Sequence, residues 1–258
     1  MKAGKATFVL VPGYWLGAWA WDEVAATLRA AGHDVHAVTP AGQAERAGEA
    51  AGGGSAGGDG GIDVDTHIAD IVRVIEDGGL DGVVLVGHSG ANMAVTGAAD
   101  RMADRIARVV YVDTGPMPSG LAAIDFYGPD ERAALEKSVA EDGGGRLIPV
   151  PPFDPDADPV NLVGLTAAHL AAMRERGTPQ PFGTATQPAA RPDPLPATPR
   201  TLIATTIPLA AVRQMGEAGN PVFAAMTGPG WTYHELPTGH WPMFSRPREL
   251  AALLAAAP

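Results

Sequence analysis

Short, largely apolar runs alternate along the chain with longer stretches whose apolar residues recur at helical spacing. Such short runs, bounded by turn-forming residues, predict buried strands. They fall at residues 6–11, 34–38, 82–86, 106–112, 201–206 and 231–236. Helices are expected at residues 18–31, from Asp65 or Thr66 as the cap to 77, and at 89–102, 129–141, 165–177 and 247–256. Strands that alternate with helices predict an α/β fold with a mostly parallel sheet covered on both faces.

The proline content and the strand pattern of the chain change in its second half. Twelve of the 24 prolines lie between Pro149 and Pro199, where the strand pattern is absent. We therefore expect residues 116–199 to form a helical cap, inserted into a core of residues 1–115 and 200–258. Seven glycines between Gly52 and Gly61 predict a flexible surface loop. That loop has no Gly-Lys-Ser/Thr sequence, so a phosphate-binding role is not expected.

Composition excludes several classes of function. The 258 residues are 46% hydrophobic and carry a formal charge of -11 without a dense Lys/Arg cluster, so no nucleic-acid partner is expected. The chain has no cysteine, which excludes a cysteine nucleophile, a zinc-thiolate site and a disulfide framework. The first apolar run, Phe8 to Val11, is too short for a signal peptide, and no run is long enough to cross a bilayer. We expect a cytoplasmic protein without membrane contact whose partner is a small-molecule substrate; the sequence leaves the oligomeric state open.

One stretch, Gly87-His88-Ser89-Gly90-Ala91, connects a predicted buried strand directly to a predicted helix. A serine between small residues in this setting is typical of a nucleophile elbow, a strained turn that exposes the hydroxyl above the sheet. The N–H of Gly90 would then point toward a developing oxyanion. The alternative is an ordinary strand–helix turn in which serine caps the helix.

A nucleophilic serine needs a base to take its proton. His240 lies in a loop directly after the last predicted strand, and the order serine then histidine is that of the elbow arrangement. His88 is expected to point away from Ser89. The remaining histidines are expected to be structural or solvated: His33, His36, His67, His169 and His234. No metal-ligand spacing is present, so no metal site is expected.

The stretch after the first strand, Pro12-Gly13-Tyr14-Trp15-Leu16-Gly17-Ala18-Trp19-Ala20-Trp21, lies where a second oxyanion donor is usually supplied. We assign that donor to the backbone N–H of Tyr14. Trp19 and Trp21 either belong to the site or pack the following helix against the sheet.

Four stretches together resemble the α/β-hydrolase superfamily over essentially the whole chain: VPGYWLGAWAWDEV, VGHSGA, VYVDTGPMP and LPTGHWPMFSRP. They look like a bacterial esterase-type branch, similar to the plant methylesterase and hydroxynitrile lyase group. The resemblance implies an α/β-hydrolase fold, a Ser–His–acid triad and no cofactor. It is much less specific for the reaction, because this fold hosts many chemistries.

Two departures from the family pattern affect the site. The usual His-Gly of the oxyanion loop is Pro12-Gly13, which keeps the backbone donor but loses the hydrogen bonds of the histidine. The region after the penultimate strand, where most relatives carry the acid, has no carboxylate before Glu217. Some relatives carry the acid one strand after the nucleophile, where this chain has Asp113. We therefore favour Asp113 over Glu217; Asp113 as a simple turn residue is the alternative.

These assignments predict acyl transfer through Ser89, His240 and Asp113, with Tyr14 and Gly90 as oxyanion donors. We expect a neutral, largely apolar or aromatic carboxylic ester, because large apolar side chains adjoin the motifs and open the cap. They are Trp15, Met117, Phe126, Tyr127 and Trp241. The competing view is that these side chains only seal the cap onto the core. A lyase of the hydroxynitrile-lyase kind and a ligand-binding pseudoenzyme remain alternative functions.

Overall fold

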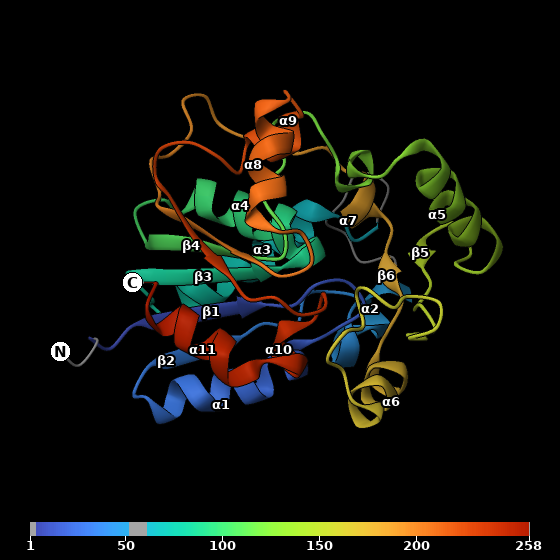
Figure 1. The fold of residues 1–258 in the computed structure, drawn as a ribbon, viewed down its shortest axis with the longest axis horizontal. Coiled ribbons are helices and arrows are strands. Elements are labelled where there is room, and N and C mark those ends of the chain that lie inside the picture. The colour runs from blue at the N-terminus through green and yellow to red at the C-terminus, as the bar shows by residue number, and fades with distance from the viewer. Residues whose placement is uncertain (1–3, 52–60, 258) are drawn as a thin grey trace.

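A single parallel sheet organises the computed structural model, which describes residues 4–51 and 61–257 (Figure 1). Its strand order is β2-β1-β3-β4-β7-β8, and all neighbouring strands run parallel. The strands are β1 (Thr7–Val11), β2 (Asp34–Ala37), β3 (Val83–His88), β4 (Ile106–Val112), β7 (Arg200–Ala204) and β8 (Trp231–Glu235). The expected α/β fold with a mostly parallel sheet is confirmed. The glycine-rich loop lies, apart from Gly61, outside the described residues.

Side chains of the central strands alternate between two hydrophobic cores, one on each face of the sheet. On β3, Val83 and Leu85 belong to one core, whereas Val84 and Val86 belong to the other. Successive strand residues point to opposite faces, so a strand buried on both sides reads as a continuous apolar run. This is why the sequence signal of β3 is strong.

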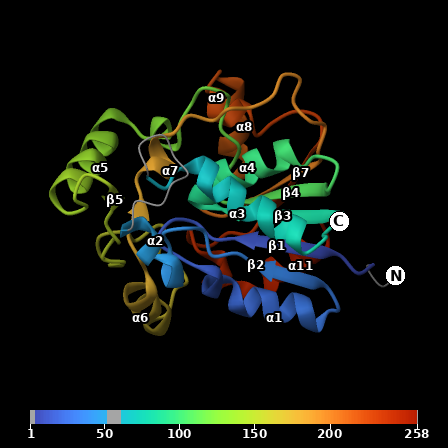
Figure 2. The ribbon, with the colours of Figure 1, turned by 180° about the vertical axis from the view of Figure 1, so that it is seen from behind.

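Helices cover both faces (Figures 1 and 2). The first core is closed by α3 (Val64–Asp77), α4 (Asn92–Arg101), α8 (Leu209–Glu217) and α9 (Pro221–Ala224). The second is closed by α1 (Asp22–Ala30), α10 (Pro242–Ser245) and α11 (Pro247–Ala255). Trp21, in a 3-10 turn ahead of α1, is fully buried in the second core, which agrees with a packing role.

The start of α3 corrects one prediction. Its N-cap is Asp63, rather than Asp65 or Thr66. The carboxylate of Asp63 accepts the N–H of Thr66 at 2.9 Å, and the Thr66 hydroxyl lies back toward the Asp63 N–H at 3.4 Å. Asp63 has the extended backbone that a cap requires, and Thr66 at the third helical position completes a capping box.

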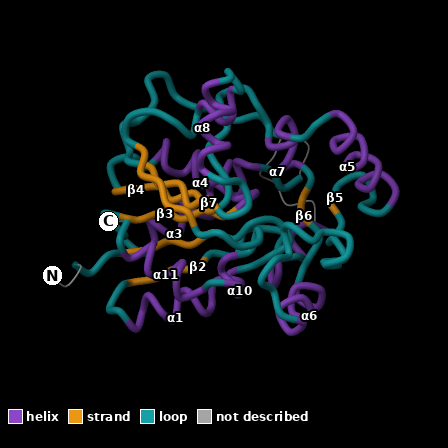
Figure 3. Tube along the Cα trace, viewed as in Figure 1, coloured by secondary structure: helices purple, strands orange, loops and turns teal. Residues whose placement is uncertain are grey.

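Residues 116–199 hold three α-helices and two short strands, which lie together beside the sheet (Figure 1). They are α5 (Pro129–Glu141), β5 (Leu147–Ile148), α6 (Ala167–Arg176), β6 (Gln180–Pro181) and α7 (Gly183–Thr186). Loops connect these elements (Figure 3). The short strands β5 and β6 pair antiparallel, and the N–H of Thr178 bonds to the carbonyl of Trp15 at 2.9 Å. The segment therefore contacts the loop that follows β1. A short helix, α2 (Gly48–Ala51), precedes the undescribed residues.

No helix in the described part of the chain is long and apolar enough to span a membrane.

Candidate active site

Ser89 lies in the turn between β3 and α4, with a left-handed φ of 50°. Non-glycine residues rarely adopt this conformation, and such strain concentrates at functional sites. Crowding explains the small neighbours: a Cβ at Gly87 would lie 2.6 Å from Cγ2 of Val95, and a Cβ at Gly13 would lie 2.9 Å from Cβ of Ser89. The turn therefore has the geometry expected of a nucleophile elbow.

His240 bridges Ser89 and Asp113. Its Nε2 lies 2.7 Å from Oγ of Ser89, and its Nδ1 lies 2.7 Å from Oδ2 of Asp113. The three residues come from the loops after β3, β8 and β4, so the parallel sheet gathers them at the carboxyl ends of its strands. The structure thus brings together the three residues that the sequence singled out.

The carboxylate of Asp113 is held on both oxygens. Oδ1 accepts the N–H groups of Thr205 and Thr206 at 3.0 and 2.9 Å, and Oδ2 accepts the Thr206 hydroxyl at 2.7 Å. The side chain is only 4% exposed, and its backbone φ is 50°. Burial by itself would raise the pKa of Asp113, but the hydrogen bond and the charge of His240, together with the bonds from Thr206, hold this pKa well below its usual range. Asp113 is therefore ionised at neutral pH.

Glu217 does not take part in this arrangement. It ends α8 and is exposed to solvent. Of the two carboxylates considered from sequence, the structure places Asp113 against His240.

His88 lies beneath His240. Its Nε2 is 2.6 Å from the carbonyl oxygen of His240, and the two ring centroids are 4.8 Å apart. Burial, and then the charge of His240, lower the pKa of His88 to about 3. His88 is therefore neutral at physiological pH, and its Nε2–H donates to a carbonyl that can only accept.

The loop after β1 lies directly beside the elbow. A Cβ at Gly90 would overlap the ring of Tyr14, so the two residues are in close contact. Within the described residues, neither the N–H of Tyr14 nor that of Gly90 donates a hydrogen bond to another protein group. Burial raises the pKa of Tyr14 far above its usual range, and the neighbouring phenol of Tyr127 adds to the rise. The Tyr14 hydroxyl lies 3.4 Å from the Thr184 carbonyl.

Two of the residues expected to contact substrate form an aromatic cluster next to the histidine. The ring of Trp241 packs edge-on against His240 at a centroid distance of 5.0 Å, and against Phe153 at 5.5 Å. Trp15 packs edge-on against the same Phe153 at 6.3 Å. Phe153, which the sequence did not single out, joins the two tryptophans and has a left-handed φ of 46°.

The other three residues lie outside this aromatic cluster. Met117 is buried in the first core. Phe126 and Tyr127 are 48% and 41% exposed, and Phe126 packs against Phe223 of α9 at 5.9 Å. Their contact with substrate stays a prediction.

The 116–199 segment also holds the loop of the histidine. The N–H of His240 donates to the carbonyl of Asn161 at 2.7 Å, and the N–H of Gly239 donates to that of Val163 at 3.2 Å. The position of His240 therefore depends on the segment predicted as a cap.

Several polar residues at the site were not predicted from the sequence. Thr205 and Thr206 directly follow β7, which pairs with β4 and therefore ends close to Asp113. Their place at the end of a predicted strand was the signal that could have indicated a contact with Asp113. No local sequence pattern indicates that Gln43 and Gln180 bond to each other, because they lie 137 positions apart. Among the described residues, no cluster of three His, Asp or Glu side chains could hold a metal ion.

Comparison with known proteins identifies the family and the fold of the chain. The model of a family described as "Alpha/beta hydrolase family" matches residues 8–253. The chain is 32% identical to a carbendazim hydrolyzing esterase from Nocardioides sp. (strain SG-4G), over 97% of this chain and 99% of that protein. Its fold is similar to that of an extracellular alpha/beta-hydrolase from a Paenibacillus species, with a TM-score of 0.75 and 21% identity over 98% of both chains. It is also similar to a variant of tomato methylketone synthase I, with a TM-score of 0.73 and 17% identity over 98% of this chain and 97% of that one.

Proposed function

The chain belongs to the alpha/beta hydrolase family and is a hydrolase of the carboxylesterase type, and we propose that it cleaves neutral, largely apolar or aromatic carboxylic esters through an acyl-enzyme on Ser89. The observation that carries the proposal is the pair of 2.7 Å contacts that His240 makes, one to Ser89 and one to Asp113. A nucleophile, a base and a carboxylate that orients the base form the arrangement that activates a serine.

Each residue has a defined part in the reaction. Oγ of Ser89 attacks the ester carbonyl carbon while Nε2 of His240 takes the hydroxyl proton. Asp113 accepts the Nδ1–H of His240, which fixes the tautomer and stabilises the imidazolium. The imidazolium then protonates the departing alcohol. Water, deprotonated by His240, releases the acid from Ser89 and regenerates the hydroxyl.

The oxyanion of both tetrahedral intermediates would be stabilised by the backbone N–H groups of Tyr14 and Gly90. Both groups are free of other hydrogen bonds within the described residues and lie on loops that touch at the elbow. Donors that are fixed before the reaction begins stabilise developing charge most strongly, because they need no reorganisation.

The charge around the site supports a neutral substrate. Two arginines of the 116–199 segment are already engaged: Arg174 donates to the carbonyls of Pro152 and Phe153, and Arg132 pairs with Asp125. Arg246 pairs with Glu249 at 3.2 Å. The net charge of -11 would also oppose an anionic ester. The aromatic pair of Trp15 and Trp241 supplies apolar surface beside His240.

A substrate panel tests the proposal. We expect higher kcat/KM for 4-nitrophenyl esters of apolar and aryl acids than for matched esters that carry a carboxylate, and carbendazim belongs in the panel because a relative is named for hydrolysing it. Ser89→Ala should abolish turnover and labelling by a fluorophosphonate probe, whereas Ser138→Ala, on α5, should change neither.

The products separate hydrolysis from the alternatives. A hydrolase releases one carboxylic acid for each alcohol, whereas a lyase releases no carboxylic acid and a pseudoenzyme releases neither the acid nor the alcohol. Turnover that persists in Ser89→Ala would refute the nucleophile. A clear preference for the anionic esters would refute the substrate class.

A further inference from the structure

Two buried glutamines lie behind the loop that carries Tyr14. Gln43 is 1% exposed and Gln180 is 0% exposed. Nε2 of Gln43 donates to the carbonyl of Gly13 at 3.2 Å and also to Oε1 of Gln180. That same Oε1 accepts the N–H of Trp15 at 3.3 Å. The two amides therefore tether the residues immediately before and after Tyr14.

The direction of these hydrogen bonds is fixed by their partners. The Gly13 carbonyl can only accept, so Gln43 must turn its NH₂ toward it, and the Trp15 N–H can only donate, so Gln180 must present its oxygen. The NH₂ of Gln180 then donates to the Thr184 hydroxyl at 2.9 Å, whose proton goes to the Pro181 carbonyl at 2.7 Å. A reversed amide at either glutamine would bring two acceptors or two donors together. The network thus has one arrangement.

The tethered loop is strained. Trp15 has a φ of 66°, a conformation that is unfavourable for a bulky side chain and persists only where the surroundings enforce it. Its N–H is held by Gln180, and its carbonyl accepts the N–H of Thr178 at 2.9 Å. The hydroxyl of Thr178 accepts the N–H of Ala44 at 2.8 Å, which joins the same segment to the loop of Gln43.

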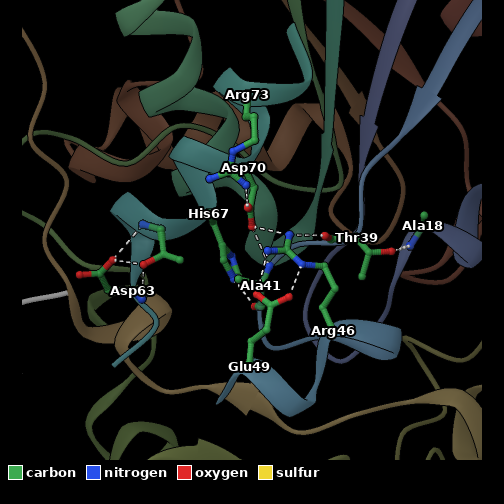
Figure 4. A network of polar contacts seen from close by, with 10 residues as sticks. Ala18, Thr39, Ala41, Arg46, Glu49, Asp63, His67, Asp70 and Arg73 are labelled. Atoms are coloured by element: carbon green, nitrogen blue, oxygen red, sulfur yellow. Dashed lines mark hydrogen bonds and ion pairs between the residues drawn. The ribbon is translucent and has the colours of Figure 1, made fainter. Parts of the chain in front are cut away.

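The loop that carries Gln43 is itself anchored to α3 (Figure 4). Asp70, which is buried, accepts the N–H of Ala41 at 2.8 Å and pairs with Arg46 at 2.8 Å. The ring Nε2 of His67 lies 2.9 Å from the Ala41 carbonyl. Residues on both sides of Gln43 are therefore fixed to the helix, which gives the amide a rigid base.

We propose that Gln43 and Gln180 are positioning residues for the oxyanion loop: they set the direction of the Tyr14 N–H by holding Gly13 on one side and Trp15 on the other. This inference rests on the proposed function. Both tethers come from amides that are distant from the loop in sequence.

Near-isosteric, apolar replacements test the proposal. A contact made mainly in the transition state affects kcat and leaves KM nearly unchanged. Loss of a whole oxyanion donor costs about 10²–10³-fold in kcat, so we expect a displaced donor in Gln43→Met and Gln180→Met to cost roughly 10–100-fold. KM should change by less than about threefold. Thr184→Val, which removes only the hydroxyl that accepts from Gln180, should show a smaller loss of kcat and remains usable if the other variants unfold.

Gln187→Met is the matched control. The Gln187 amide also joins the 116–199 segment to α3, because it accepts the N–H of Asp65 at 3.1 Å and donates to its carboxylate at 2.8 Å. It makes no bond to the loop of Tyr14. We therefore expect Gln187→Met to keep the wild-type kcat.

An inhibitor that imitates the tetrahedral intermediate gives the second readout. The Ki of an aryl boronic acid, which adds to the serine, should rise in the Gln43 and Gln180 variants by the same factor by which kcat/KM falls, whereas the affinity for the product alcohol should stay constant. Folded Gln43→Met and Gln180→Met enzymes with wild-type kcat and Ki would overturn the inference, as would an equal loss in Gln187→Met. Full turnover by Ser89→Ala would instead overturn the proposed function.

Discussion

Replacing Asp113 by asparagine exchanges one carboxylate oxygen for an NH₂ group and should prevent His240 from acting as the base. The carboxylate accepts four hydrogen bonds: the N–H groups of Thr205 and Thr206, the Thr206 hydroxyl, and Nδ1 of His240. In the variant, the amide oxygen has to face the two backbone N–H groups, because these can only donate. The new NH₂ then faces Nδ1 of His240 and donates to it.

This reversal determines the tautomer of His240. An Nδ1 that accepts a hydrogen bond carries no proton, so the proton moves to Nε2, which lies 2.7 Å from the Ser89 hydroxyl. The imidazole can no longer take the proton of Ser89. We expect kcat to fall by about 10⁴-fold with KM little changed, which corresponds to about 5.5 kcal/mol in the activation free energy.

The assay is steady-state hydrolysis of an apolar 4-nitrophenyl ester, with circular dichroism to verify folding. Glu217→Gln is the matched control, because it makes the same change of carboxylate to amide at the exposed end of α8 and should leave kcat unchanged. A folded Asp113→Asn enzyme within tenfold of the wild-type kcat would exclude this role of Asp113, and so would an equal loss in Glu217→Gln.

Three further predictions concern the surroundings of the site. Gly90→Ala should lower kcat by at least tenfold in ester hydrolysis, because its Cβ would overlap the ring of Tyr14 and displace an oxyanion donor; an unchanged kcat would contradict this contact. Thr206→Val should lower kcat by about tenfold, because Asp113 loses a 2.7 Å hydrogen bond from the hydroxyl, and a wild-type rate would exclude that role. His88→Gln should alter the pH dependence of stability in denaturant titrations. The pKa of His88 is lowered to about 3 in the folded state, whereas it is about 6.5 in an unfolded chain. Between these values only the unfolded state binds the proton, so wild-type stability falls with decreasing pH by up to about 1.4 kcal/mol per unit from this group, and the variant should lose that slope.

The sequence revealed the parts of the fold whose signals are local. The strand β3 is buried on both faces and therefore reads as an uninterrupted apolar run, and the elbow follows it directly. Asp113 could be proposed because it ends a strand and because the usual acid position is empty. Proline-rich segments gave weaker signals, and the two-residue strands β5 and β6 are too short to produce a periodicity.

The sequence did not reveal how distant polar groups meet. The bond between Gln43 and Gln180 spans 137 positions, and each glutamine looks like an ordinary surface residue within its own segment. The cap of α3 was misplaced for a related reason: Asp63 and Asp65 are both plausible caps from composition, and only the extended backbone at Asp63 decides between them. Pairings of this kind depend on tertiary structure, which local patterns do not encode.

Trapping the acyl-enzyme tests most directly whether Ser89 is the nucleophile. The protein is mixed with a slowly deacylating aryl ester and quenched in acid, and its intact mass is measured before the modified peptide is mapped. We expect a mass increase of one acyl group, located on Ser89, that appears with a burst of one alcohol per enzyme and is absent from Ser89→Ala. An acyl group on another residue, or steady turnover without any covalent species or burst, would contradict this role of Ser89.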